Sequence, residues 1–272
     1  MAEKHNLKIA VYQSGARAKC SPEARLADLD NALATRAAPL DCIVCPELYL
    51  SGYRAGERHH ALAEPMDGSF SKAVAALAQK HRCCIVYGYP ERIDGVVYNA
   101  AAAIASDGTL LANHRKTLLP NAYERTWFTP GDRLTSFRLG GWKVALLVCC
   151  EVEHPDIVRS CARQGADLII VPTALTANWG IVAHQVVQTR AFENGVYVAY
   201  ANHAGKEHDL TYLGASCIVS PHGGDVVRAG PSEQIIEAEL DAASLQLART
   251  TLPYLMDFDH LSRLRGVTEP KG

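Results

Sequence analysis

The feature that most constrains the fold is a regular alternation of short apolar runs with segments of helical periodicity. Apolar runs of strand length occupy 8–12, 83–88, 96–104, 168–171 and 196–200. Apolar side chains recur at helical spacing in 22–38, 71–81, 156–164 and 183–194. This alternation predicts one α/β domain in which helices cover sheets, and it is compatible with one central sheet or with two stacked sheets.

Length and composition exclude several classes of protein. The chain has 272 residues, 48% of them hydrophobic, which is enough for a substantial core in a single domain over 1–272. The formal net charge is −2 and there is no basic block, so we expect no nucleic-acid partner. No apolar stretch reaches transmembrane length, and residues 1–6 are polar. We therefore expect a cytoplasmic protein with no membrane partner.

Nine cysteines are present, and most of them lie in apolar runs. Free cysteine behaves as a small buried hydrophobe, and a reducing cytosol keeps it unpaired. Cys42 and Cys45 have the spacing of a redox motif, but residues three apart on a strand point to opposite faces. We therefore expect the cysteines to pack in the core, with Cys149 and Cys150 as the exceptions.

Three apolar runs end in side chains that could do chemistry. The run 144–148 leads into Cys149, the run 43–45 leads to Glu47, and the run 110–114 leads to Lys116. In α/β sheets, ligands bind at the carboxyl ends of the strands. A thiol, a carboxylate and an ammonium placed there suit a hydrolase that attacks an amide.

Each of these groups has a role in amide hydrolysis. A Cys149 thiolate would be a strong nucleophile, and a nearby Lys116 ammonium would favour the thiolate and stabilise the oxyanion. The Glu47 carboxylate could accept the thiol proton and later activate water. The backbone N–H of Cys150 is a second candidate oxyanion donor. Such a mechanism needs no metal and no cofactor.

Taken together, these motifs resemble those of the nitrilase superfamily of carbon–nitrogen hydrolases. The matching segments follow in the family's order from residue 8 to about residue 240: Pro46-Glu47, Arg115-Lys116-Thr117, Cys149, Pro155-Asp156, Arg190-Ala191 and Ala201-Asn202. The resemblance implies a four-layer α-β-β-α sandwich. Residues 87–92 and 200–202 look like small bacterial aliphatic amidases, a group that includes 5-aminopentanamidase.

Cys149 is favoured over Cys150 as the nucleophile for two reasons. Neighbouring residues on a strand face opposite ways, so only one of the two can face the pocket. The resemblance also places an acidic residue two positions after the nucleophile and a proline six positions after it, and Glu151 and Pro155 fit Cys149.

Further site candidates lie in the loops that follow these strands. The resemblance implies a second glutamate, for which Glu124 is the candidate; it could hold Lys116 or position substrate, or be a solvated loop carboxylate. Glu151 could simply pair with a structural cation. Candidates for substrate binding are Tyr53, Tyr123, Ala174, Trp179 and His203. Trp179 could equally cap the core, and His203 could equally bond a loop.

The favoured hypothesis is a cofactor-free thiol amidohydrolase. It would convert small aliphatic amides, with or without an ω-amino group, to carboxylate and ammonia through a cysteine thioester. A nitrilase and an N-carbamoyl amine hydrolase are alternatives, and a non-catalytic binding protein on the same fold is a third. The sequence departs from the amidase pattern at Cys150, Glu151, His154 and Leu118. These departures bear on which substrate is bound more than on which reaction is catalysed.

The resemblance also implies a homodimer or a larger homo-oligomer. The helix after the nucleophile, 156–164, would pair two subunits, and residues 250–272 would form a C-terminal arm that crosses to the partner.

Overall fold

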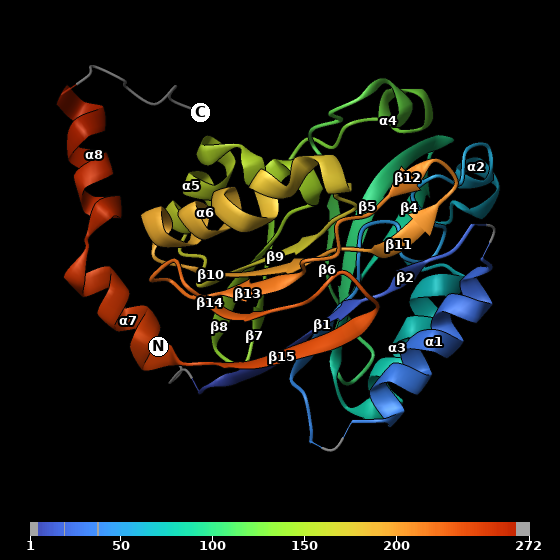
Figure 1. Cartoon of the computed structure of the whole chain (residues 1–272), viewed down its shortest axis with the longest axis horizontal. Helices are drawn as coiled ribbons and strands as arrows, with labels where there is room; N and C mark the ends of the chain where they lie inside the picture. Colours follow the sequence, from blue (N-terminus) through green and yellow to red (C-terminus); the bar gives the residue numbers. More distant parts are fainter. Residues whose placement is uncertain (1–4, 19, 37, 265–272) are drawn as a thin grey trace.

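Two six-stranded sheets stack face to face in the computed structural model, which describes residues 5–18, 20–36 and 38–264 (Figure 1). The first sheet has the order β15-β1-β3-β4-β5-β6. Its strands, in chain order, are β1 Leu7–Gln13, β3 Cys42–Val44, β4 Cys84–Ile93, β5 Val96–Ile104, β6 Leu110–Arg115 and β15 Gln234–Leu240. The strands β1, β3 and β4 are parallel, whereas β15, β5 and β6 join by antiparallel pairing.

The second sheet has the order β14-β13-β10-β9-β8-β7. Its strands are β7 Thr135–Leu139, β8 Trp142–Leu146, β9 Leu168–Pro172, β10 Tyr197–Ala201, β13 Cys217–Val219 and β14 Asp225–Arg228. Its centre, β8-β9-β10, is parallel. A small third sheet joins β2 Gly15–Ala16, β11 Ala204–Glu207 and β12 Leu210–Thr211.

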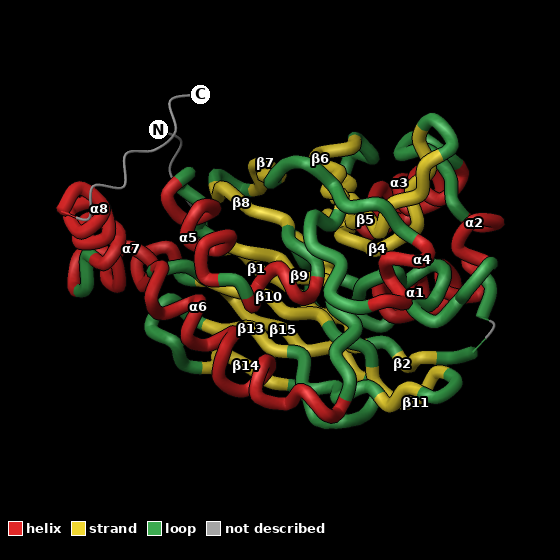
Figure 2. The backbone as a smooth tube through the Cα atoms, turned by 90° about the horizontal axis from the view of Figure 1, so that it is seen from above, coloured by secondary structure: helices red, strands yellow, loops and turns green. Residues whose placement is uncertain are grey.

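Helices cover the outer face of each sheet, which completes four layers. The helices α1 (Pro22–Ala34) and α3 (Ser69–His81) pack on the first sheet, and α5 (Pro155–Arg163) and α6 (Val187–Asn194) lie along the second (Figure 2). Three apolar layers result, one between the sheets and one beneath each helix pair. The α-β-β-α sandwich implied by the resemblance is therefore confirmed.

Cys42 and Cys45 lie where the alternation of strand faces predicts, whereas Cys20 is only half-buried, so the expectation of core packing is wrong for Cys20. Cys42 belongs to the apolar layer between the sheets, whereas Cys45 belongs to the layer beneath α1 and α3. All nine cysteines are free thiols. Neighbouring sulfurs on opposite faces of a sheet cannot pair, so the redox-like spacing has only a packing role.

Several local features differ from the sequence-based expectations. The helix expected over 183–194 begins with a π-helical turn, Val182–Val186, before α6. The strand expected to reach Cys149 ends at Leu146. Two short helices, α2 (Arg58–Leu62) and α4 (Ala122–Trp127), stand in the connections after β3 and β6.

At the C-terminal end, α7 (Ala242–Thr251) and α8 (Tyr254–Leu264) run away from the sheets at one end of the molecule (Figures 1 and 2). Residues 265–272 of the expected arm lie outside the described residues. Within the described ranges, no helix combines the length and the apolar character that crossing a membrane requires.

Candidate active site

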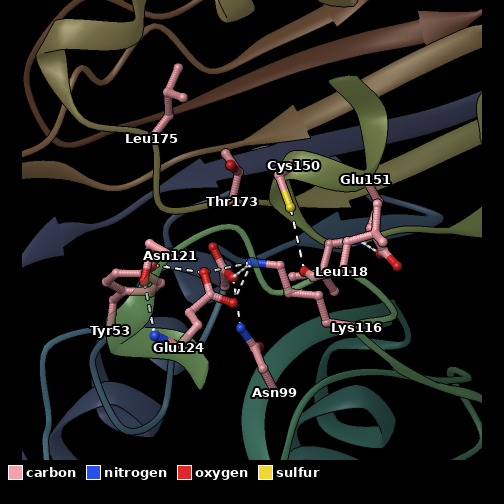
Figure 3. A network of polar contacts seen from close by, with 12 residues as sticks. Tyr53, Asn99, Lys116, Leu118, Asn121, Glu124, Cys150, Glu151, Thr173 and Leu175 are labelled. Carbon is pink, nitrogen blue, oxygen red and sulfur yellow. Dashed lines mark hydrogen bonds and ion pairs between the residues drawn. The ribbon is translucent and has the colours of Figure 1, made fainter. Parts of the chain in front are cut away.

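A completely buried lysine forms the centre of the site. Lys116 follows the last residue of β6, and its backbone N–H donates to the carbonyl of Asn99 on β5 at 2.8 Å. Its ammonium donates to Glu47 Oε1 at 2.7 Å and to Glu124 Oε1 at 2.8 Å (Figure 3). Burial opposes the charge, but the two carboxylates outweigh it and raise the pKa of Lys116 well above its usual value. The site therefore holds a fixed positive charge.

Glu47 sits in the turn that follows β3 and is fully buried. Its Oε1 also accepts a hydrogen bond from the Asn99 amide at 2.7 Å. Its Oε2 is buried and has no hydrogen-bond partner among the residues that the structure describes. Burial raises the pKa of Glu47, and Lys116 opposes this shift. One oxygen is thus held in place while the other is free to accept a proton.

Glu124 is held in place by its own helix and by an aromatic side chain. Asn121 caps α4 by accepting the Glu124 N–H at 2.9 Å. The Tyr53 hydroxyl donates to Glu124 Oε1 at 2.8 Å and accepts from the Asn121 amide at 3.1 Å. Of the two functional roles open to Glu124, the geometry supports holding Lys116, whose ammonium lies 2.8 Å from both Oε1 and Oε2 of the carboxylate.

Cys149 stands at a sharp turn between the end of β8 and a short 3₁₀ helix, Cys149–Glu153. Its φ is +51°, a left-handed conformation that a side chain other than glycine rarely adopts. Such strain concentrates at functional positions, and nucleophiles on strand-to-helix turns are an established case. The Cys150 N–H, just beyond the turn, has no acceptor within the described part of the chain.

The strand argument for choosing between the two cysteines is wrong. Neither residue is on a strand, because β8 ends at Leu146, and both side chains line the same cavity. The Cys150 thiol points to the backbone and donates to the Leu118 carbonyl at 3.5 Å (Figure 3). The left-handed turn at Cys149, not alternation along a strand, separates the two thiols.

The expected thiolate is also not supported. Burial, with Glu47 next, raises the pKa of the Cys149 thiol well above its usual value, and Lys116 offsets this only in part. The ammonium is paired with Glu47 and Glu124, and the negative charges of these two carboxylates oppose a resting anion on Cys149. The resting group is a thiol, which makes a nearby proton acceptor necessary.

Glu151 joins the lysine segment to the cysteine segment. Its buried carboxylate accepts the Thr117 N–H at 2.8 Å, the Val148 N–H at 2.6 Å and a bond with His114 Nε2 at 2.8 Å. Burial opposes ionisation, but these bonds outweigh it and lower the pKa of Glu151. A structural role therefore fits Glu151 best, because its bonds to Thr117, Val148 and His114 hold the chain on both sides of the site in register.

A cavity of about 670 Å³ opens in front of Cys149. Four of the five predicted binding residues line it, namely Tyr53, Tyr123, Ala174 and Trp179, together with Glu124. Trp179 is 62% exposed, so it borders the cavity mouth and does not cap the core.

His203 is the exception. It is buried behind Glu47, where its Nε2 bonds the Glu47 carbonyl at 2.8 Å and its Nδ1 faces Ser14 Oγ at 3.4 Å. Burial lowers the pKa of His203 to about 3, which keeps the ring neutral. The predicted contact with substrate is therefore wrong, and the histidine supports the turn that carries Glu47.

Sequence reasoning missed three residues at the site. Asn99 orients Glu47 and Asn121 orients Glu124, while Glu153 lines the cavity four residues after Cys149. Asn99 gave a signal, because it is a lone amide in the otherwise apolar run of β5. Among the described residues, no group of three His, Cys, Asp or Glu side chains could hold a metal ion.

Comparison with known proteins places this geometry in a family. A family model described as carbon–nitrogen hydrolase matches residues 8–250. The chain belongs to the carbon–nitrogen hydrolase family. It is therefore an enzyme of the nitrilase superfamily that hydrolyses carbon–nitrogen bonds.

Individual relatives in this family are similar over most of their length. A Pseudomonas protegens protein named "Hydrolase in pqqF 5'region" is 41% identical over 239 residues, 85% of this chain and 84% of the relative. An (R)-stereoselective amidase from Pseudomonas sp. is 33% identical over 84% of this chain and 82% of its own length.

A solved structure matches the whole architecture. In a mutant amidase from Nesterenkonia sp. AN1, the acetamide moiety of fluoroacetamide is attached covalently at the active-site cysteine. This chain superposes on it with a TM-score of 0.82 and 29% identity, covering 93% of this chain and 97% of that one.

Proposed function

We propose that this enzyme is a cofactor-free thiol amidohydrolase that converts small aliphatic amides to carboxylate and ammonia. Cys149 is the nucleophile, Glu47 is the general base and acid, and Lys116 with the Cys150 N–H stabilises the oxyanion. Glu124 is the second glutamate, which holds Lys116. Relatives that are named amidases support the reaction class.

Acylation begins with a neutral thiol. As Cys149 Sγ attacks the amide carbon, its proton passes to Glu47, and the carbonyl electron pair moves onto oxygen. Lys116 and the Cys150 N–H donate to that oxyanion. When the tetrahedral intermediate collapses, the carbon–nitrogen bond breaks and Glu47 gives its proton to the departing nitrogen. Ammonia leaves, and a thioester remains on Cys149.

Deacylation uses the same groups in the same order. Glu47 takes a proton from a water molecule as the water oxygen attacks the thioester carbon. The oxyanion forms again beside Lys116, and its collapse breaks the carbon–sulfur bond. Cys149 leaves as a thiolate, recovers a proton from Glu47, and the acid product is released.

The observation that carries this proposal is the division of labour at Glu47. One carboxylate oxygen is fixed by Lys116 and Asn99, while the other is buried without a partner among the described residues. Glu47 is close enough to Cys149, which lines the cavity, for its charge to raise the pKa of that thiol. A binding protein would gain nothing from a desolvated, unpartnered carboxylate oxygen, because such a group destabilises the fold.

Ammonia release from a panel of compounds tests the proposal. The panel contains pentanamide, 5-aminopentanamide, pentanenitrile and an N-carbamoyl amine, each with and without EDTA. We expect the amides to be hydrolysed fastest, ω-amino amides among them, and EDTA to have no effect. Faster hydrolysis of the nitrile or of the carbamoyl amine would favour a nitrilase or an N-carbamoyl amine hydrolase instead. No turnover of any compound would contradict the proposal.

We also propose that the enzyme works as a homodimer or larger homo-oligomer. The helices α7 and α8 expose Leu247, Met256 and Leu261, which are 58%, 74% and 47% accessible. Exposed apolar side chains grouped on one projecting segment are typical of an interaction surface.

A further inference from the structure

The side chains that line the cavity include more carboxylates than cations. Glu47 and Glu124 share the Lys116 ammonium. Arg54 and Asp209, which also line the cavity, pair with each other, with Arg54 Nη2 at 2.9 Å from both carboxylate oxygens. Glu153 also lines the cavity, so the lining holds three carboxylates, Glu124, Glu153 and Asp209, against one cation, Arg54.

Glu153 is half-buried at the cavity wall. The nearby Arg190 is engaged elsewhere, because its Nη2 donates to the Glu153 backbone carbonyl at 2.7 Å and its Nη1 pairs with the Glu193 carboxylate at 3.1 Å. The Glu153 carboxylate itself forms no hydrogen bond or ion pair with any described residue. The side chain is half-buried, and this burial raises the pKa of Glu153, while the charges of His154, Lys116 and Arg190 oppose the shift.

The position of Glu153 relative to Cys149 is fixed by the 3₁₀ helix that contains both. With a rise of about 2.0 Å per residue, the two α-carbons lie on the order of 8 Å apart along the helix axis. A substrate bound with its amide carbon at Cys149 could therefore reach Glu153 with the far end of an acyl chain several methylene groups long.

We propose that Glu153 is the residue that determines acyl-chain specificity, by binding a primary ammonium group at the end of the chain remote from the amide. This assignment rests on the proposed amidase function. A partly desolvated carboxylate gains most from a cation, gains little from a methyl group and repels an acid. The order of preference is then ω-amino amide, neutral amide, ω-carboxy amide.

The test compares kcat/KM for 5-aminopentanamide, pentanamide and 4-carbamoylbutanoate. We expect wild-type enzyme to prefer the amino compound over pentanamide by tenfold or more. In Glu153→Gln, that preference should shrink to within about twofold, and in Glu153→Lys the carboxy compound should overtake the amino compound. Glu23→Gln makes the same substitution at an exposed residue of α1 outside the cavity and should keep the wild-type preference.

The outcomes separate the two proposals. An unchanged preference in Glu153→Gln, or no preference in wild-type enzyme that hydrolyses pentanamide, would overturn the assignment of Glu153 and leave the amidase proposal standing. No hydrolysis of any amide would overturn both. A measurement without variants adds a check: pentan-1-amine should inhibit pentanamide hydrolysis by wild-type enzyme more strongly than pentan-1-ol, and equal inhibition would contradict the proposal.

Discussion

At the scale of residues, the chemistry depends on which groups are already satisfied. Lys116 donates two of its three N–H bonds to carboxylates, which leaves one for an oxyanion, and Tyr53 and Asn121 hold Glu124 in place. Glu124 Oε2 accepts no hydrogen bond from the described residues, but it lies 2.8 Å from the ammonium. One oxygen of Glu47, the Cys150 N–H and the Glu153 carboxylate have no partner among the described residues. These are the groups to which we assign proton transfer, oxyanion binding and substrate selection.

Glu47→Gln should lower kcat by at least about a thousandfold, because an amide cannot take the thiol proton and general-base catalysis contributes roughly 10²–10⁴. The wild-type pH profile provides a second readout. The base must be deprotonated, and burial raises the pKa of Glu47 above its usual 4.5, so kcat/KM should fall as the pH drops through a value above 4.5. Substantial activity in a folded Glu47→Gln enzyme would contradict the assignment.

The sequence was sufficient to find the three residues to which we assign the reaction and insufficient to find their surroundings. Glu47, Lys116 and Cys149 could be predicted because each follows an apolar run near a strand end. Asn99 lies inside a strand and Glu153 inside a short helix, so the position of neither in the chain reveals what its side chain faces. His203 was misplaced because a residue next to a strand end can point behind a site as readily as into it.

At the scale of elements, close backbone contacts position the catalytic turns. The turn carrying Glu47 crosses β4 at Gly88, where a Cβ would lie 2.3 Å from the Leu48 nitrogen and 2.8 Å from the Pro46 oxygen. Only glycine allows that approach. The strand ends could be predicted from apolar runs, but a contact between segments forty residues apart could not.

Gly88→Ala should therefore displace Glu47 and lower kcat by about a hundredfold, since misplacements on the order of 1 Å have that effect. Gly224→Ala is the matched control, because a Cβ there meets nothing within 4 Å. Steady-state kinetics on both variants, with thermal melts to confirm folding, make the comparison. Equal kcat values would show that the Gly88 contact does not position the base.

At the scale of the whole molecule, the sandwich places chemistry where the loops of both sheets meet. The Glu47 N–H donates to the Thr173 carbonyl at 3.4 Å, which links the turn after β3 to the loop after β9. The alternation of strands and helices predicts that helices cover sheets. Only the family resemblance predicted two stacked sheets instead of one central sheet. Local periodicity does not encode which strands become neighbours.

The projecting helices α7 and α8 predict where the subunits associate. Met256→Glu places a charge on the exposed apolar face of α8 and should shift the enzyme to monomers in sedimentation velocity at micromolar concentration. Ile93→Glu, at a comparably apolar exposed position on β4, should leave the assembly unchanged. A wild-type monomer, or identical assembly of both variants, would contradict the proposed role of this segment.

The most direct test of the central claim compares two adjacent thiols in one cavity. Ammonia release from pentanamide is measured for Cys149→Ala and Cys150→Ala, each verified as folded by its melting curve. The account predicts a loss of at least about a thousandfold for Cys149→Ala, as expected for removal of a nucleophile, and measurable turnover for Cys150→Ala. An active Cys149→Ala enzyme beside an inactive Cys150→Ala enzyme would contradict it.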